Sequence, residues 1–149
     1  MSRTLIIGVG NEFRGDDAVG LVMARRLKEI VPDTIEIIEH SGEGASLMQA
    51  WEGADRVYLI DAVNSGAEAG TIHRLDGANQ PVPTEFFHYS THAFSVAEAV
   101  EVARKLDLLP RTLIIYGVEG AVFDHGAPLS PEVSRAADAI FKQFLQELA

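Results

Sequence analysis

The chain has 149 residues, of which 47% are hydrophobic and 23% are charged, and its formal net charge is −10. This length fits one domain with an ordinary core, and the composition is that of a soluble globular protein rather than a disordered or fibrous one. The negative charge argues against a nucleic-acid partner, because binding to a phosphate backbone depends on Lys and Arg. The sequence contains no cysteine, which removes disulfides, thiolate metal ligands and cysteine nucleophiles.

The N-terminal stretch MSRTLIIGVG has too short an apolar run for a signal peptide and passes directly into a predicted strand. No apolar run in the sequence approaches the roughly 18 residues that a membrane-spanning helix needs. The sequence shows no linker, repeat or low-complexity segment. We therefore expect residues 1–149 to form a single cytoplasmic domain that has neither a membrane nor a nucleic acid as partner.

Strand and helix patterns alternate in the first part of the chain. Continuous apolar runs are typical of buried parallel strands, and apolar residues spaced three or four apart are typical of helices packed on a sheet. Pro32 ends the first predicted helix. In chain order we expect a strand at Thr4–Val9, a helix from Val19 to Val31, a strand at Thr34–Ile38, a short helix at Ala45–Trp51 and a strand at Arg56–Ile60 that ends on Asp61.

The second part of the chain adds one strand of a different kind. Residues 70–75 alternate as in an exposed edge strand, and the short loop before them favours an antiparallel orientation. The last helix has the clearest start, with Ser130 as N-cap and Pro131 in its first turn. After the edge strand we expect a helix along Ala93–Ala103 capped by Ser90 or Thr91, a strand at Thr112–Val118 and a final helix from Pro131 to Leu148.

This order of elements predicts an α/β fold. We expect a three-layer α/β/α sandwich around a mostly parallel, twisted sheet of about five strands with one antiparallel edge strand. In such sheets, ligands bind beyond the carboxyl ends of the strands. The glycine-rich loop that follows the first strand and Asp61, at the end of the third, are therefore expected at the same edge.

The loop GVGNEFRGDDAVG, residues 8–20, has glycines for close backbone approach but ends in two aspartates. A dinucleotide-binding fingerprint needs G-x-G-x-x-G, and the spacing from Gly10 to Gly15 does not fit it. A P-loop needs G-x-x-x-x-G-K-[ST], and Asp16 stands where the lysine belongs. Both nucleotide interpretations also place Asp16 and Asp17 against phosphate, so charge argues against them.

A phospho-receiver domain is another alternative. It has an acid pair after its first strand and a phospho-accepting aspartate after its third, which would be Asp61. However, its acid pair lies directly at the strand end, and it uses a lysine after the last core strand, where this chain has GVEG at 117–120. Without that cation, a phosphoryl group has no counter-charge.

A further interpretation takes the acids as metal ligands. Carboxylates are hard oxygen donors, and a neighbouring histidine shifts selectivity towards ions such as zinc, nickel or iron. An Asp-Asp pair at a helix start is also commonly a cap, because the helix dipole favours negative charge there. A cap explains one of Asp16 and Asp17, but it does not explain the pair, the glycine loop and Asp61 together.

Four blocks of sequence occur in a fixed order along the chain. They are GVGNEFRGDDAVG at 8–20, LIDA at 59–62, STHAF at 90–94 and GVEG at 117–120. With these blocks the chain resembles, over nearly its whole length, the hydrogenase maturation endopeptidases, which trim a C-terminal extension from the large subunit of nickel–iron hydrogenases. The resemblance implies an endopeptidase of the aspartic type whose partner is the hydrogenase large-subunit precursor.

The resemblance also implies a metal site. A carboxylate in the glycine-loop block, an aspartate after the third strand and a histidine before a helix match Asp17, Asp61 and His92, with Asn11 and Asp16 as supporting residues. Family members often carry Glu where this chain has Asp17. The implied metal is nickel carried by the precursor, so the free protein is expected to be metal-free. Catalysis would be mediated by the metal contacts, and no separate nucleophile is identified.

One segment departs from the family pattern. After the second strand many members have an Asp-Gly-Gly-Thr-like run, whereas this chain has HSGEG at 40–44. The family links that run to the choice of hydrogenase, so the departure leaves the partner isoform open, with a bidirectional or NAD-linked soluble enzyme as one option. Another metal-dependent hydrolase, or a peptidyl-tRNA hydrolase-like relative on a similar sheet, stays open as an alternative function.

The remaining polar and aromatic residues have structural interpretations. His40 is expected on the functional rim, together with Glu43, which would repel or orient a substrate tail. Nothing marks Ser90 or Ser95 as an activated nucleophile. We expect surface or loop positions for His40, His73 and His125, and packing roles for Trp51, Phe86 and Phe87.

Overall fold

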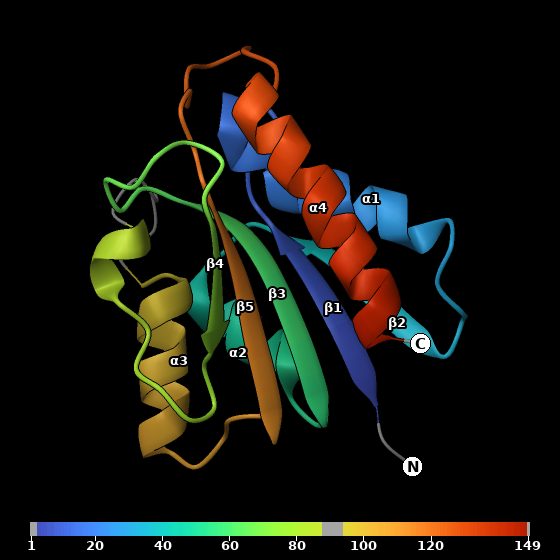
Figure 1. Cartoon of the computed structure of the whole chain (residues 1–149). Coiled ribbons are helices and arrows are strands. Elements are labelled where there is room, and N and C mark those ends of the chain that lie inside the picture. The colour runs from blue at the N-terminus through green and yellow to red at the C-terminus, as the bar shows by residue number, and fades with distance from the viewer. Residues whose placement is uncertain (1–2, 88–93, 149) are drawn as a thin grey trace.

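The computed structural model of the chain describes residues 3–87 and 94–148. Within these residues the strands are β1 (Thr4–Val9), β2 (Ile35–His40), β3 (Arg56–Val63), β4 (Ile72–Asp76) and β5 (Thr112–Glu119). They form a five-stranded sheet in the order β2-β1-β3-β5-β4 (Figure 1). All neighbours are parallel except β4, which is antiparallel to β5. The predicted α/β fold with one antiparallel edge strand is confirmed.

The helices cover both faces of the sheet. The described residues form α1 (Val19–Lys28), α2 (Gly44–Trp51), α3 (Val96–Lys105) and α4 (Pro131–Glu147), and the short 3-10 helices η1 (Gly15–Ala18) and η2 (Thr84–Phe87). Figure 1 shows α1 and α4 on one face of the sheet and α2 and α3 on the other. The three layers expected from the order of elements are therefore present. None of the helices in the described part of the chain combines the length and apolar character needed to cross a membrane.

Alternating side chains of the strands supply two apolar cores, one beneath each pair of helices. On β3, Leu59 and Val63 pack towards α2 and α3, whereas Tyr58 and Ile60 pack towards α1 and α4. Trp51 of α2 is buried in the first core, which confirms its predicted packing role. Each fully buried large apolar side chain contributes about 1.5–3 kcal/mol to folding, so these two cores hold the sheet rigid beneath its loops.

The predicted ends of the third strand and of the first helix are wrong. The third strand does not end on Asp61 but continues to Val63, because β5 stays paired with it as far as the register pair Val63–Glu119. The first helix ends at Lys28 rather than at Val31, in a turn in which the Leu27 carbonyl accepts from the amide of Val31 at 3.0 Å.

The helix starts were predicted with unequal success. Ser130 caps α4 as expected, since its side chain accepts from the amide of Val133 at 3.4 Å, and Pro131 occupies the first turn. By contrast, α3 is capped by Ser95, whose amide and hydroxyl both donate to Glu98 Oε1, at 3.0 and 2.9 Å. The predicted caps of this helix, Ser90 and Thr91, lie outside the described residues.

Candidate active site

The glycine loop turns back sharply at the carboxyl end of β1. The Gly10 amide donates to the His40 carbonyl at 3.0 Å, and a Cβ added at Gly10 would lie 1.9 Å from the carbonyl oxygen of Asp17. At Gly20 an added Cβ would lie 2.3 Å from the carbonyl oxygens of both Val9 and Ile60. Only glycine fits where backbone packs on backbone this closely. The glycines therefore hold the acidic end of the loop against the ends of β1 and β3.

The two neighbouring aspartates of this loop have different surroundings. Asp16 is fully buried, and its carboxylate accepts from the amides of Ala121 and Val122 at 2.7 and 2.9 Å. It also accepts from the amide and the hydroxyl of Ser130 at 2.7 and 2.9 Å. These four hydrogen bonds join the Asp16 carboxylate to the loop between β5 and α4.

Asp17, the predicted metal contact, lies in η1 with its side chain 9% exposed. Its Oδ2 atom is 4.0 Å from Nη1 of Arg14, and its carbonyl oxygen accepts from the Asn11 amide at 3.3 Å. The Asn11 side chain accepts from the Phe13 amide at 2.9 Å. Asn11 therefore shapes the turn that carries Asp17.

Asp61 lies at the same edge of the sheet as the glycine loop. It is 4% exposed and its Oδ1 atom accepts from the Ala62 amide at 2.8 Å. Since Gly8 of β1 is in register with Ile60, Asp61 is level with the end of β1, where the loop begins. By strand alternation its side chain shares the sheet face of Leu59 and Val63, which is the face covered by α2 and α3.

The predicted third contact, His92, belongs to residues 88–93 and lies outside the described residues. The chain on both sides of that segment is attached to the carboxyl edge. The Phe86 carbonyl accepts from the amide of Asn64, three residues beyond Asp61, at 2.8 Å, and the Phe94 carbonyl accepts from the amide of Gly44 at 2.8 Å. Residues 3–87 and 94–148 by themselves contain no cluster of three or more potential metal ligands.

The loop between β2 and α2 borders the site. Its Gly42 amide donates to Nδ1 of the half-buried His40 at 2.9 Å. The carboxylate of Glu43 caps α2, accepting from the amides of Ala45 and Ser46 at 2.9 and 3.0 Å. Glu43 therefore has a local structural role that the sequence analysis did not assign to it, because the helix was expected to begin at Ala45.

A buried hydrogen-bond cluster at the ends of β4 and β5 was missed by the sequence analysis. His73, expected at the surface, is only 20% exposed, and its Nε2 atom lies 3.1 Å from Oε1 of the buried Glu119. The His73 ring packs on Phe86, whose predicted packing role is confirmed. A signal for this cluster was the acid in GVEG, since a glutamate at the end of an otherwise apolar strand needs partners when buried.

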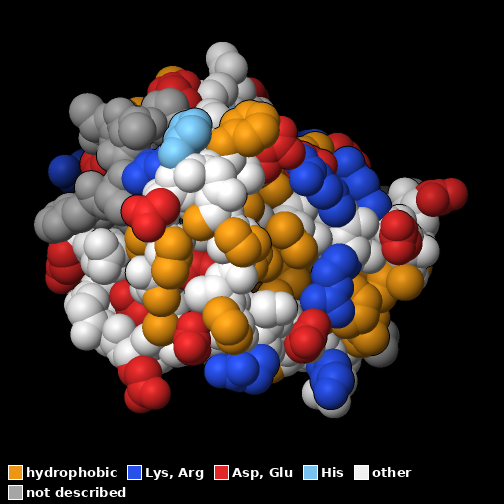
Figure 2. Space-filling model, turned by 90° about the horizontal axis from the view of Figure 1, so that it is seen from above, with side chains coloured by type: hydrophobic (Ala, Val, Ile, Leu, Met, Phe, Trp, Pro, Cys, Tyr) orange, Lys and Arg blue, Asp and Glu red, His pale blue; other side chains and the backbone are white. Residues whose placement is uncertain are grey.

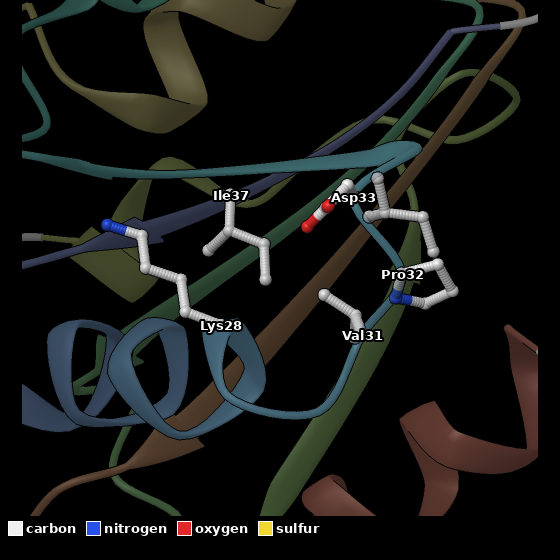
Figure 3. Close-up of a pocket in the computed structure, with 6 residues that line it drawn as sticks. Lys28, Val31, Pro32, Asp33 and Ile37 are labelled. Atoms are coloured by element: carbon white, nitrogen blue, oxygen red, sulfur yellow. The ribbon is translucent and has the colours of Figure 1, made fainter.

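The surface at this edge of the sheet combines charged and apolar side chains. Figure 2 looks onto it and shows charged side chains around the margin, with apolar side chains nearer the middle. A separate hollow of about 160 Å³, shown in Figure 3, is lined by side chains of α1, of β2 and of the turn between them. Because that hollow includes Ile35, the first residue of β2, it lies towards the opposite edge of the sheet from Asp61.

Comparisons with known proteins agree with the fold. The family description "Hydrogenase maturation protease" matches residues 18–147. The chain is 28% identical to the hydrogenase 2 maturation protease of Escherichia coli, over 98% of this chain and 90% of that protein. It is also 28% identical to the hydrogenase expression/formation protein HupD of Bradyrhizobium diazoefficiens, over 89% of this chain and 70% of that protein.

Among solved structures, the solution structure of an endopeptidase from Escherichia coli is similar to this chain with a TM-score of 0.84 and 27% identity, over 98% of this chain and 91% of that one. A match that spans most of the chain, to relatives with the same fold, shows that the chain belongs to the hydrogenase maturation protease family and is a hydrogenase maturation endopeptidase.

Proposed function

We propose that the chain removes the C-terminal extension from the nickel-loaded large-subunit precursor of a nickel–iron hydrogenase, and that it recognises the nickel through Asp17, Asp61 and His92. The observation that carries the proposal is the position of two buried carboxylates, Asp17 and Asp61, on the loop and strand ends that meet at one edge of the sheet. Phe86 and Phe94, the described residues near the two ends of the stretch that contains His92, are hydrogen-bonded to the same edge.

The chemistry of these residues suits a metal that arrives with the substrate. Two carboxylates and one imidazole leave coordination positions open, so a nickel ion can keep its ligands from the precursor while it is bound. Contacts to the nickel would fix the precursor and orient its scissile peptide bond at the edge of the sheet. In this account nickel is part of the substrate, and the free chain is metal-free.

Asn11 and Asp16 support the loop in this proposal. Asn11 shapes the turn before Asp17, and Asp16 ties the loop to residues 121, 122 and 130. Neither side chain is proposed to touch the nickel. The precursor is the only macromolecular substrate that we propose, and the net charge of −10 favours a protein over a nucleic acid. We further propose that residues 1–149 act as one domain in the cytoplasm.

The assignment of the three metal contacts is tested with single variants. Asp17→Asn, Asp61→Asn and His92→Ala are each incubated with the nickel-loaded precursor, and the products are weighed by mass spectrometry. We expect processing to fall to background in all three. Asp138→Asn is the control, because this exposed residue pairs with Arg26 on the surface and is not part of the proposed site. Full processing by Asp61→Asn and His92→Ala would show that the assignment is wrong.

A further inference from the structure

Glu119 is a buried carboxylate, only 1% exposed, that lies outside the proposed metal contacts. Its Oε2 atom accepts from the Ser65 amide at 2.8 Å, and its Oε1 atom accepts from the Ser65 hydroxyl. The same Oε1 atom lies 3.1 Å from Nε2 of His73. Glu119 is the last residue of β5, Ser65 follows the end of β3, and His73 is in β4, so one side chain connects three neighbouring segments of the sheet.

Stability alone does not account for a carboxylate at this position. Burial of a charged group carries a desolvation cost, and apolar residues of similar volume often replace buried ionic groups without loss of stability. The strand end already packs through the apolar neighbours Val63 and Val118. What an apolar residue cannot do is fix the orientation of Ser65 and of the His73 ring.

His73 and Ser65, the two partners of Glu119, each contact or adjoin residues near the proposed nickel contacts. The His73 ring packs on the Phe86 ring, with 4.8 Å between the ring centres and 51° between their planes. Phe86 belongs to η2, which ends at Phe87, and residues 88–93 with His92 follow directly in the sequence. The other partner, Ser65, directly follows Asn64 in the sequence. Asn64 lies three residues beyond Asp61, and its amide donates to the Phe86 carbonyl.

We propose that Glu119 is a positioning residue for nickel recognition. Through His73 and Phe86 it holds the helix that precedes His92, and through Ser65 it holds the strand end that follows Asp61. It therefore fixes the strand end beyond Asp61 and the position of η2 without touching the nickel. This inference rests on the proposed function, since it needs Asp61 and His92 to act on the metal of the precursor.

The geometry of Glu119, rather than its charge, carries this role. In Glu119→Gln the amide oxygen accepts from the Ser65 amide, while the NH2 group donates to the Ser65 hydroxyl and the His73 ring, both of which also have acceptor sites. Glu119→Gln therefore keeps all three contacts, and Glu119→Ala removes them. His73→Ala removes the ring contact with Phe86 at a partly exposed position that tolerates truncation better than Glu119.

The test is a steady-state cleavage assay at increasing concentrations of nickel-loaded precursor. We expect Glu119→Ala and His73→Ala to raise the precursor concentration for half-maximal rate by about tenfold, as for other residues that orient metal ligands. The maximal rate should change much less, and Glu119→Gln should behave like the wild type. Glu147→Ala is the matched control, because it removes a carboxylate that joins Arg74 of β4 to Tyr116 of β5, the strands that Glu119 joins through His73.

Thermal unfolding of each variant separates a local effect from a general loss of structure. The inference would be overturned if Glu147→Ala raised the precursor concentration for half-maximal rate by the same tenfold at an equal loss of thermal stability. It would also be overturned if folded His73→Ala cleaved the precursor like the wild type. Equal defects in Glu119→Gln and Glu119→Ala would also overturn it, because charge and not position would then be the cause. If the wild type cleaves no precursor, the proposed function itself fails, and that outcome is distinct from the others.

Discussion

Asp16 and Asp17 are adjacent in sequence but have different surroundings. Four donors bind the Asp16 carboxylate, and Oδ2 of Asp17 lies 4.0 Å from Nη1 of Arg14. Sequence reasoning identified the pair, and it gave Asp17 the metal contact by resemblance. The difference in surroundings arises from residues more than 100 positions away, at Ala121, Val122 and Ser130, which no local pattern reveals.

Replacing aspartate by asparagine should therefore lower stability at position 16 and abolish precursor processing at position 17. Asp16→Asn brings an NH2 group against backbone donors, and we expect it to lower the free energy of unfolding by about 3 kcal/mol. Asp17→Asn should remove precursor processing, because it takes away a proposed nickel contact. Urea unfolding and the cleavage assay measure the two effects. Unchanged stability of Asp16→Asn, or full processing by Asp17→Asn, would contradict this division of roles.

Phe13 has the properties of a contact for the precursor. Its side chain is 61% exposed, although its backbone is fixed by hydrogen bonds to the Asn11 side chain and to the amide of Gly126. A large apolar side chain on a fixed backbone, four residues from Asp17, loses little conformational freedom on binding. Such residues commonly supply much of the energy of a protein interface.

We expect Phe13→Ala to raise the precursor concentration for half-maximal cleavage by about tenfold, without a comparable change in thermal stability. The matched control is Leu106→Ala, because Leu106 is 59% exposed but follows α3 at the opposite end of the sheet. Equal effects of the two variants on cleavage would argue against a contact at Phe13.

At the scale of elements, a buried tyrosine joins α4 to the sheet. The Tyr116 hydroxyl of β5 donates to Glu147 of α4 at 2.7 Å and accepts from Arg74 of β4 at 3.2 Å. Burial, with a smaller contribution from the Glu147 hydrogen bond, raises the pKa of Tyr116 to about 12. Since the unfolded chain releases this proton near pH 10, the folded state keeps it more tightly.

Because the pKa of Tyr116 is raised in the folded state, the stability of the protein should fall at high pH. The contribution of Tyr116 to stability is fully present below about pH 10 and is lost as the pH rises from about 10 to about 12. We expect the free energy of unfolding to fall more steeply over this interval in the wild type than in Tyr116→Phe, which has no proton to release. Urea unfolding at several pH values measures this difference. Parallel curves for the two proteins would contradict the assignment.

The bounds of helices and strands were predictable where a single local sequence pattern determines them. The apolar run at Thr4–Val9 predicted the bounds of β1, and Ser130 with Pro131 predicted the start of α4. The start of α3 was missed because three serine and threonine residues compete there, and the deciding feature is the pairing of Ser95 with Glu98. The cluster of His73 and Glu119 depends on the register of β4 against β5, which the sequence does not specify.

At the scale of the whole molecule, two cores hold the sheet and two buried carboxylates tie its loops together. Asp16 connects the glycine loop to the loop after β5, and Glu119 connects the ends of β3, β4 and β5. Asp17 lies on the glycine loop that Asp16 anchors, and Asp61 lies on β3, beyond whose end Ser65 binds Glu119. The contacts of His92 remain a prediction from the sequence.

We propose that the chain cleaves its precursor only when nickel is bound. The most direct measurement is mass spectrometry of nickel-loaded and nickel-free precursors after incubation with the wild-type chain. We predict a single C-terminal truncation of the nickel-loaded precursor and no change in the nickel-free one. Equal truncation of both precursors would show that cleavage does not depend on nickel, and truncation of neither by the folded chain would show that these precursors are not its substrate.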